Sequence, residues 1–137
     1  MTKSKFPKIV LCVSGLIALT IGGMIQISPV DFYATNNIDI GGNVNLLSEI
    51  RASSGALLAS GVLIFTGAFV SQLTFTSMVF ATLLYLSYGL FRFASMVVDG
   101  MPVDSLVEAG IVEVSVGIVC LFCLWKYWDE LSSNTSE

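Results

Sequence analysis

The 137-residue sequence has no histidine, and it has only three cysteines and three prolines. Without histidine, haem bound by two imidazoles and histidine-ligated zinc or copper sites are excluded. Charged residues are also scarce: they make up 12% of the chain, whereas about 25% is typical of soluble domains. The six basic residues form no basic stripe, so no nucleic-acid partner is expected.

Long apolar segments take the place of the missing charges. Hydrophobic residues account for 55% of the chain, and its mean hydropathy is +0.85. Four segments, at about 9–27, 44–70, 74–98 and 105–128, each reach the roughly 20 residues that an α-helix needs to cross a bilayer. Because these segments are continuous rather than alternating, they do not fit the strands of a membrane barrel. We therefore expect an all-α, integral membrane four-helix bundle that forms one domain over residues 1–137.

The placement of basic residues predicts the orientation of the four spans. Lysines precede the first span and lie at the end of the fourth: Lys3, Lys5, Lys8 and Lys126. The connections after the first and third spans carry aspartates and no lysine or arginine: Asp31, Asp39, Asp99 and Asp104. The positive-inside rule then places both termini in the cytoplasm. The first span is longer than the apolar region of a usual signal peptide and ends in no A-x-A-like site, so we expect it to be retained.

The predicted spans contain ionisable residues near one face of the bilayer, among them Arg51, Arg92, Glu108 and Glu113. A charge at membrane depth costs about 2.5–3.5 kcal/mol on insertion scales, so such a residue normally faces the bundle interior and has a partner. Arg51, Arg92 and Glu113 lie at similar depths, roughly 10 Å from the outer ends of their helices at 1.5 Å per residue. We therefore predict one buried polar site in the outer half of the membrane, where the planar arginine groups hold the carboxylate.

Other polar residues near this site have separate predicted roles. Glu108 lies three residues after Ser105, a capping-box pattern that gives it a local role at the start of the fourth helix. With Glu108 engaged there, two arginines face one carboxylate, and the site would favour an anion such as a carboxylate, a phosphate or a lipid head group. Tyr85 and Tyr88 would add hydroxyl donors, and Asp99 is a second candidate partner for the arginine on the third span. The structural alternative is an ion-pair network that only fixes helix register.

Cys120 and Cys123 form a C-x-x-C pair in the fourth span, which suggests a comparison with four-helix membrane thiol oxidoreductases. Those enzymes need a thiol pair near the outer surface, whereas this pair lies in lipid near the reducing side, where thiolates are disfavoured. No Ser-His-Asp, phosphate-binding-loop or dinucleotide-binding pattern is present. The sequence therefore gives no basis for an enzymatic assignment, and no cofactor or metal is expected.

Short motifs occur in a defined order along the spans. They are Glu49-Ile50-Arg51 with the small residues from Ala52 to Ala59, then Gly89-Leu90-Phe91-Arg92, then Asp99-Gly100-Met101-Pro102, then Glu113. In order and spacing they resemble a family of small bacterial inner-membrane proteins catalogued as domain-of-unknown-function family 4345. The resemblance covers nearly the whole chain, and it implies four transmembrane helices, a bacterial membrane and a common role for Arg51, Arg92 and Glu113, but no activity. The family usually has an aromatic residue and paired glycines after the first arginine, where this chain has Ser54-Gly55-Ala56.

We therefore interpret the sequence as a small binding or accessory membrane protein with an outward-facing polar pocket. A transporter-like or channel-like protein for an anionic solute is the first alternative, and a membrane thiol redox enzyme is the second. Expected partners are membrane lipid, an anionic ligand, and either a second copy or another membrane protein. Small residues at four-residue spacing, such as Ala52, Ala56 and Ser60, suit close helix packing within the bundle or between copies.

Overall fold

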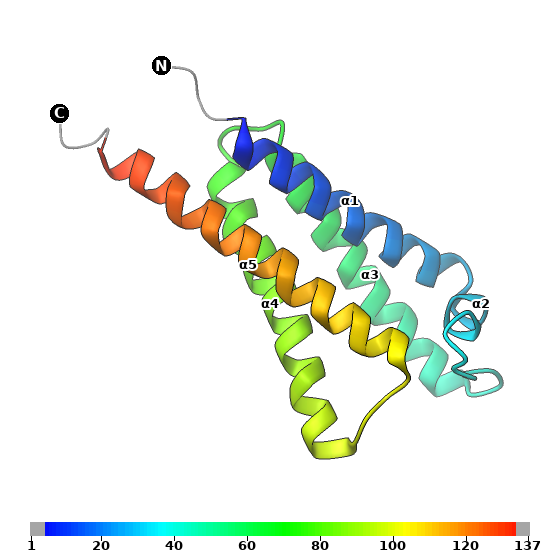
Figure 1. Cartoon of the computed structure of the whole chain (residues 1–137). Coiled ribbons are helices and arrows are strands. Elements are labelled where there is room, and N and C mark those ends of the chain that lie inside the picture. Colours follow the sequence, from blue (N-terminus) through cyan, green and yellow to red (C-terminus); the bar gives the residue numbers. More distant parts are fainter. Residues whose placement is uncertain (1–4, 134–137) are drawn as a thin grey trace.

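The computed structural model describes residues 5–133, with side chains to residue 129, and this part of the chain is all-helical. Its helices are α1 (Phe6–Ile27), α2 (Pro29–Ala34), α3 (Val44–Gly67), α4 (Thr74–Asp99) and α5 (Asp104–Ser133). Among the described residues, α1, α3, α4 and α5 are each long and apolar enough to cross a membrane (Figure 1). The predicted all-α fold with four spans is confirmed. Lys3, which contributes to the predicted orientation, lies outside the described residues.

The helix ends follow from local features of the sequence. The Asn43 side chain accepts a hydrogen bond of 3.1 Å from the Leu46 N–H and caps the start of α3. Gly100 ends α4 with a φ of 101°, a left-handed conformation that glycine adopts without strain. The predicted second span continued to residue 70, but α3 ends at Gly67 and the apolar residues 68–70 belong to the turn. Hydropathy alone does not distinguish an apolar turn from the last turn of a helix.

The long helices pack as two tight pairs, α1 with α3 and α4 with α5. A Cβ built on Gly15 of α1 would lie 2.8 Å from the Cα of Phe65 on α3. Similarly, a Cβ built on Gly89 of α4 would lie 2.9 Å from the backbone nitrogen of Val114 on α5. Real side chains do not approach a backbone this closely, so the two glycines set the separation within each pair. Small residues at helix interfaces commonly have this role in membranes.

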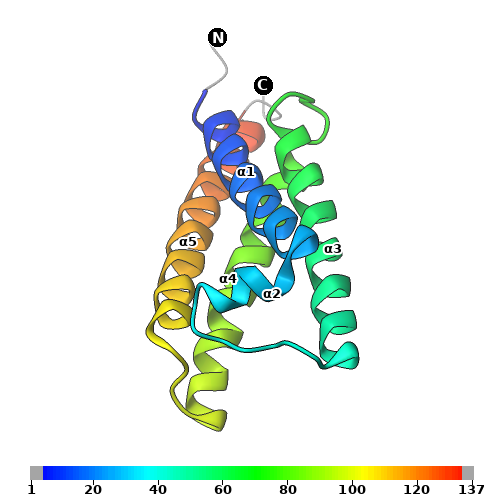
Figure 2. The same ribbon diagram turned by 90° about the vertical axis from the view of Figure 1, so that its right-hand side faces the viewer.

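The two pairs join at the end of the bundle that holds the chain termini. Fully buried side chains from all four long helices meet there: Leu11, Ile64, Met78 and Cys120. The Ser77 hydroxyl of α4 also donates a hydrogen bond of 2.9 Å to the Leu63 carbonyl of α3. Toward the other end the pairs separate, and the short helix α2 lies across the space between them (Figure 2). The bundle is therefore closed at the end with the core cluster. Toward the other end, all five helices line a cavity.

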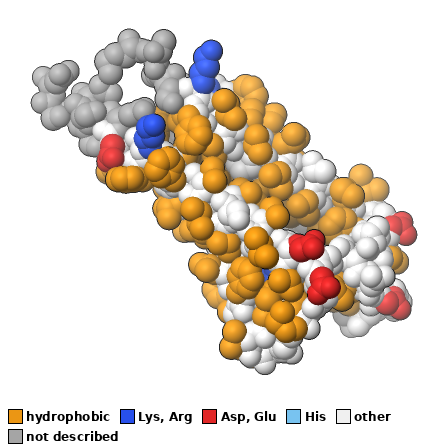
Figure 3. All heavy atoms as spheres, viewed as in Figure 1, with side chains coloured by type: hydrophobic (Ala, Val, Ile, Leu, Met, Phe, Trp, Pro, Cys, Tyr) orange, Lys and Arg blue, Asp and Glu red, His pale blue; other side chains and the backbone are white. Residues whose placement is uncertain are grey.

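Apolar side chains cover most of the length of the face that Figure 3 shows. Lysine and arginine side chains are most prominent at the end that holds the termini, with a further small area near the middle of this face, and most of the visible aspartate and glutamate side chains lie toward the opposite end. An apolar band between two charged ends is the surface that a bilayer-spanning bundle requires.

Candidate functional site

Arg92 of α4 and Glu113 of α5 form a side-on ion pair. Arg92 Nε donates to Glu113 Oε2 at 3.0 Å, and Nη2 donates to Oε1 at 2.9 Å, which fixes the orientation of both groups. Gly110 of α5 makes room for the arginine, because a Cβ built there would lie 3.1 Å from Arg92 Cδ. The two side chains are 26% and 19% exposed. The ion pair is therefore only partly buried, whereas a buried Arg/Glu site was predicted.

Arg51 lies apart from this pair. Its Nη1 donates to the backbone carbonyl of Gln26 near the end of α1, and Ser54 Oγ donates to Gln26 Oε1 at 2.6 Å. A cation is favourable there, because the last carbonyls of a helix lack partners within the helix. The predicted layer of Arg51, Arg92 and Glu113 therefore does not form. Its members belong to different helix pairs, which separate at this end of the bundle.

The two predicted tyrosine donors have different surroundings. Tyr85 is 6% exposed, and its hydroxyl donates to the backbone carbonyl of Ser14 on α1. Tyr88 is 38% exposed, and its hydroxyl has no hydrogen-bond partner among residues 5–129. It lines the same cavity as Glu113 and Tyr33 of α2. Only Tyr88 of the two predicted donors is therefore available to a ligand.

Glu108 and Asp99 take no part in the ion pair. Because α5 begins at Asp104, Ser105 already lies inside its first turn, and the predicted capping box with Glu108 is wrong. The Glu108 side chain is exposed to the surroundings of the bundle. Asp99 accepts a hydrogen bond of 2.8 Å from Ser95 Oγ at the end of α4, so its nearest polar partner is on its own helix.

A cavity of about 490 Å³ lies between the two helix pairs, and all five helices line it. In this inner cavity, the apolar part of the lining includes Ile17, Ile21, Leu57, Leu84 and Val112. The polar part includes the ion pair, Tyr88, Tyr33 of α2 and Asn36 in the turn that follows α2. The charged residues of the lining, Arg92 and Glu113, balance each other. The inner cavity thus combines an apolar surface with a polar group of no net charge.

Sequence reasoning did not find the contribution of α2 to the inner cavity. The Ser28-Pro29 pair is a visible signal for the start of a short helix. The direction in which that helix leaves α1 depends on the space between the helix pairs, which the sequence does not report. As a result, Tyr33 and Asn36 were not among the predicted site residues.

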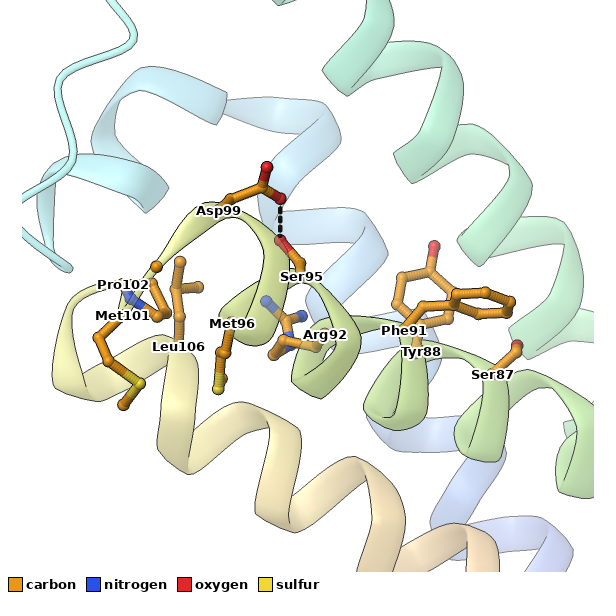
Figure 4. Close-up of a pocket in the computed structure, with 11 residues that line it drawn as sticks. Ser87, Tyr88, Phe91, Arg92, Ser95, Met96, Asp99, Met101, Pro102 and Leu106 are labelled. Carbon is orange, nitrogen blue, oxygen red and sulfur yellow. Dashed lines mark hydrogen bonds between the residues drawn. The ribbon is translucent and has the colours of Figure 1, made fainter.

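A second hollow, of about 690 Å³, follows α4 and its connection to α5 (Figure 4). Two of the most exposed apolar residues in this α4 groove are Phe91 and Met101, at 74% and 75% exposed. The hydrogen bond between Ser95 and Asp99 lies along one side. Three residues line both the α4 groove and the inner cavity: Tyr88, Arg92 and Leu106. The two hollows are therefore neighbours that share side chains.

The cysteines lie elsewhere. Cys120 and Cys123 are buried in the core cluster at the closed end of the bundle, and Cys12 packs against that cluster. None of the three lines the inner cavity or the α4 groove. Within residues 5–129, no three cysteine, aspartate or glutamate side chains gather closely enough to hold a metal ion. The thiols act as small apolar core groups in this arrangement.

The fold and these hollows define a small multi-span helical membrane protein with an ion pair beside a cavity. Residues 6–124 match the family described as Domain of unknown function (DUF4345), and the chain belongs to this family. The resemblance found from the motifs is thereby confirmed. No curated protein and no solved structure gives a match. The family supplies no activity, so any function has to be argued from the site.

Proposed function

We propose that this protein is a non-enzymatic binding protein that holds an uncharged amphiphile in the inner cavity. The observation that carries the proposal is the cavity of about 490 Å³, mainly apolar, with a charge-balanced ion pair and tyrosine side chains in its lining. Binding sites for small molecules commonly have volumes of about 300–1,000 Å³ and combine apolar walls with a few polar groups. A molecule with an apolar chain and a polar head group would satisfy both parts of this lining.

The ion pair determines which head group is favoured. Arg92 uses Nε and Nη2 to bind Glu113, which leaves the Nη1 N–H groups for other acceptors. Together with the Tyr88 hydroxyl, these donors suit a carbonyl, ester or hydroxyl oxygen. A charged head group would add an uncompensated charge at membrane depth, which is costly. An uncharged head group with acceptor atoms is therefore favoured. The anion predicted from the sequence would need two arginines facing one carboxylate.

The alternative functions fit this site less well. An anion transporter or channel would need net positive charge along its path, and the second arginine, Arg51, does not line the inner cavity. A thiol redox enzyme would need a thiol that substrate reaches, and Cys120 and Cys123 are 0% and 1% exposed within the core. Neither alternative has an observation of its own in its favour.

We further propose a location in a bacterial inner membrane, with both termini in the cytoplasm. Lysine and arginine side chains are most prominent at the end of the bundle that holds the termini, and most of the visible acidic side chains lie toward the α2 end (Figure 3). The positive-inside rule then places the inner cavity in the periplasmic half of the bilayer. The experiment is an Asp39→Cys variant, in a background without the native cysteines, treated with an impermeant thiol reagent. Labelling in intact spheroplasts supports this orientation, and labelling only after lysis contradicts it.

The binding proposal is tested with three amphiphiles that share one chain and differ in head-group charge: monodecanoylglycerol, decanoate and decyltrimethylammonium. Each is added to the purified full chain, and the thermal unfolding midpoint is measured. A ligand that binds only the folded state raises this midpoint by mass action. We expect the uncharged glycerol ester to give the largest increase. Equal increases for all three, or none for the uncharged compound, would contradict the proposal.

A matched pair of variants tests whether the increase in the unfolding midpoint comes from binding in the inner cavity. Leu84 lines the cavity, whereas its neighbour Leu83 is 63% exposed and lines neither hollow. The Leu84→Trp variant fills the cavity and is expected to lose the stabilisation by monodecanoylglycerol. The Leu83→Trp variant carries the same substitution on the lipid-facing side and is expected to retain it. An equal response of the two variants would show that the compound binds outside the cavity.

A further inference from the structure

Building on the proposed binding function, we propose that the α4 groove is the route by which the amphiphile passes from the lipid bilayer into the inner cavity. In this proposal, the Tyr88 and Leu106 side chains form the movable part of the boundary, and Arg92 forms its fixed part. The source of the ligand is then the hydrocarbon of the membrane, and the aqueous phase is bypassed.

The α4 groove and the inner cavity share part of their lining. Tyr88, Arg92 and Leu106 each line both the groove and the cavity. The boundary between the two hollows therefore includes side chains that face both of them. Rotamer changes of accessible side chains take picoseconds to nanoseconds, whereas collective movements of helices take microseconds or longer.

The side chains at the boundary between the groove and the cavity differ in how firmly they are held. The α4 and α5 backbones are in close contact at Gly89, so the helices around the boundary are held together. Arg92 is held by its two hydrogen bonds to Glu113. Tyr88, in contrast, is 38% exposed and has no hydrogen-bond partner for its hydroxyl within residues 5–129. Its ring is therefore less restrained than the Arg92 side chain at this boundary.

The exposed apolar residues of the groove favour the membrane as the source of the ligand. Phe91 and Met101 in the groove are 74% and 75% exposed, so the groove offers apolar contact at its surface. An amphiphile that moves along such a surface keeps its chain in apolar surroundings, whereas a hydrated solute would lose water contacts there. On the side of α2, the cavity is lined by Phe32, Tyr33 and Asn36.

The experiment measures access to a cysteine in the inner cavity. Ala109 of α5 lines the cavity but not the groove, and it is changed to Cys in a chain whose three native cysteines are Ala. The full-length protein in lipid nanodiscs is treated either with pyrene maleimide, which partitions into lipid, or with a charged methanethiosulfonate reagent, which stays in water. We expect pyrene maleimide to label A109C faster than the charged reagent does.

A second substitution tests the route. Ser95 is exposed, faces the groove and does not line the cavity. Ser95→Trp is expected to slow labelling of A109C by pyrene maleimide several-fold. Ser115→Trp places the same side chain at an exposed position of α5 that lines neither hollow, and it is expected to leave the rate unchanged. Faster labelling by the charged reagent, absence of labelling, or equal rates in the two Trp variants would each overturn the proposed route.

The binding proposal and the route proposal fail in different ways. Stabilisation by monodecanoylglycerol measures whether the cavity binds an uncharged amphiphile, whatever path it takes. If that stabilisation is present and Ser95→Trp does not slow labelling, the binding function stands and the route is wrong. If Ser95→Trp slows labelling but no amphiphile stabilises the protein, the route stands and the binding function is wrong.

Discussion

The hydroxyl of Tyr85 on α4 donates a hydrogen bond to the backbone carbonyl of Ser14 on α1, and so connects the two helix pairs. Tyr85 belongs to the buried core cluster and also lines the inner cavity. It therefore marks the level at which the closed end of the bundle gives way to the cavity. Tyr88, the next tyrosine on α4, lies on the open side of this boundary.

This contrast predicts different effects for two identical substitutions. Tyr85→Phe removes a hydrogen bond across the pairs and is expected to cost about 1 kcal/mol of stability, as such bonds do in membrane proteins. Tyr88→Phe removes no hydrogen bond to any residue from 5 to 129 and is expected to leave the free energy of unfolding unchanged. It should, however, reduce the stabilisation by monodecanoylglycerol, because the hydroxyl is a proposed ligand donor. Denaturant unfolding with and without the compound distinguishes these outcomes, and equal loss of stability in both variants would contradict them.

The sequence predicts how deep a residue lies in the bilayer, but it does not predict which helices pack together. The spans and the similar depths of Arg92 and Glu113 follow from hydropathy and helical rise. Which helices lie side by side does not follow from these quantities. Arg51 was predicted at a similar depth, yet α3 pairs with α1, and its guanidinium binds the end of α1.

The glycines explain why this pairing was difficult to predict. The sequence shows stripes of small residues on the first, second and fourth spans. Only some of these positions are close contacts, such as Gly15, whereas Gly23 and Gly55 have no neighbouring atoms within 4 Å of a built Cβ. Small residues indicate that helices are able to approach, but they do not identify the partner helix.

Two glycines on α1 provide a direct test of the packing. Gly15→Ala would place a Cβ 2.8 Å from the Cα of Phe65, so we expect it to destabilise the protein by about 1–3 kcal/mol, the usual cost of overpacking. Gly23→Ala meets no atom within 4 Å and is expected to be neutral or to stabilise by up to about 1 kcal/mol through higher helix propensity. The free energy of unfolding of both variants is measured in the same detergent. Similar values for the two would show that α1 and α3 do not pack as described.

The ion pair is tested by a double-mutant cycle. Arg92→Gln and Glu113→Gln each leave one charge without its partner and are each expected to cost about 1–3 kcal/mol, less than a fully buried pair because both side chains are partly exposed. The double variant leaves no charge and should be more stable than the sum of the single changes predicts. Additive losses would indicate that the two groups do not interact. Recovery of stability in the double variant, together with loss of monodecanoylglycerol binding, would give the pair both a structural and a ligand-binding role.

The two arginines are finally expected to differ in function. Arg51→Gln loses the hydrogen bond to the Gln26 carbonyl and the favourable charge at the end of α1, which together are worth about 0.5–2 kcal/mol of stability. It is expected to keep the response to monodecanoylglycerol, because Arg51 does not line the inner cavity. Arg92→Gln is expected to lose that response. Thermal unfolding midpoints with and without the compound, normalised to each variant's own midpoint, separate the two effects. If both variants lost the response equally, the two arginines would act in one site, as their equal depth first suggested.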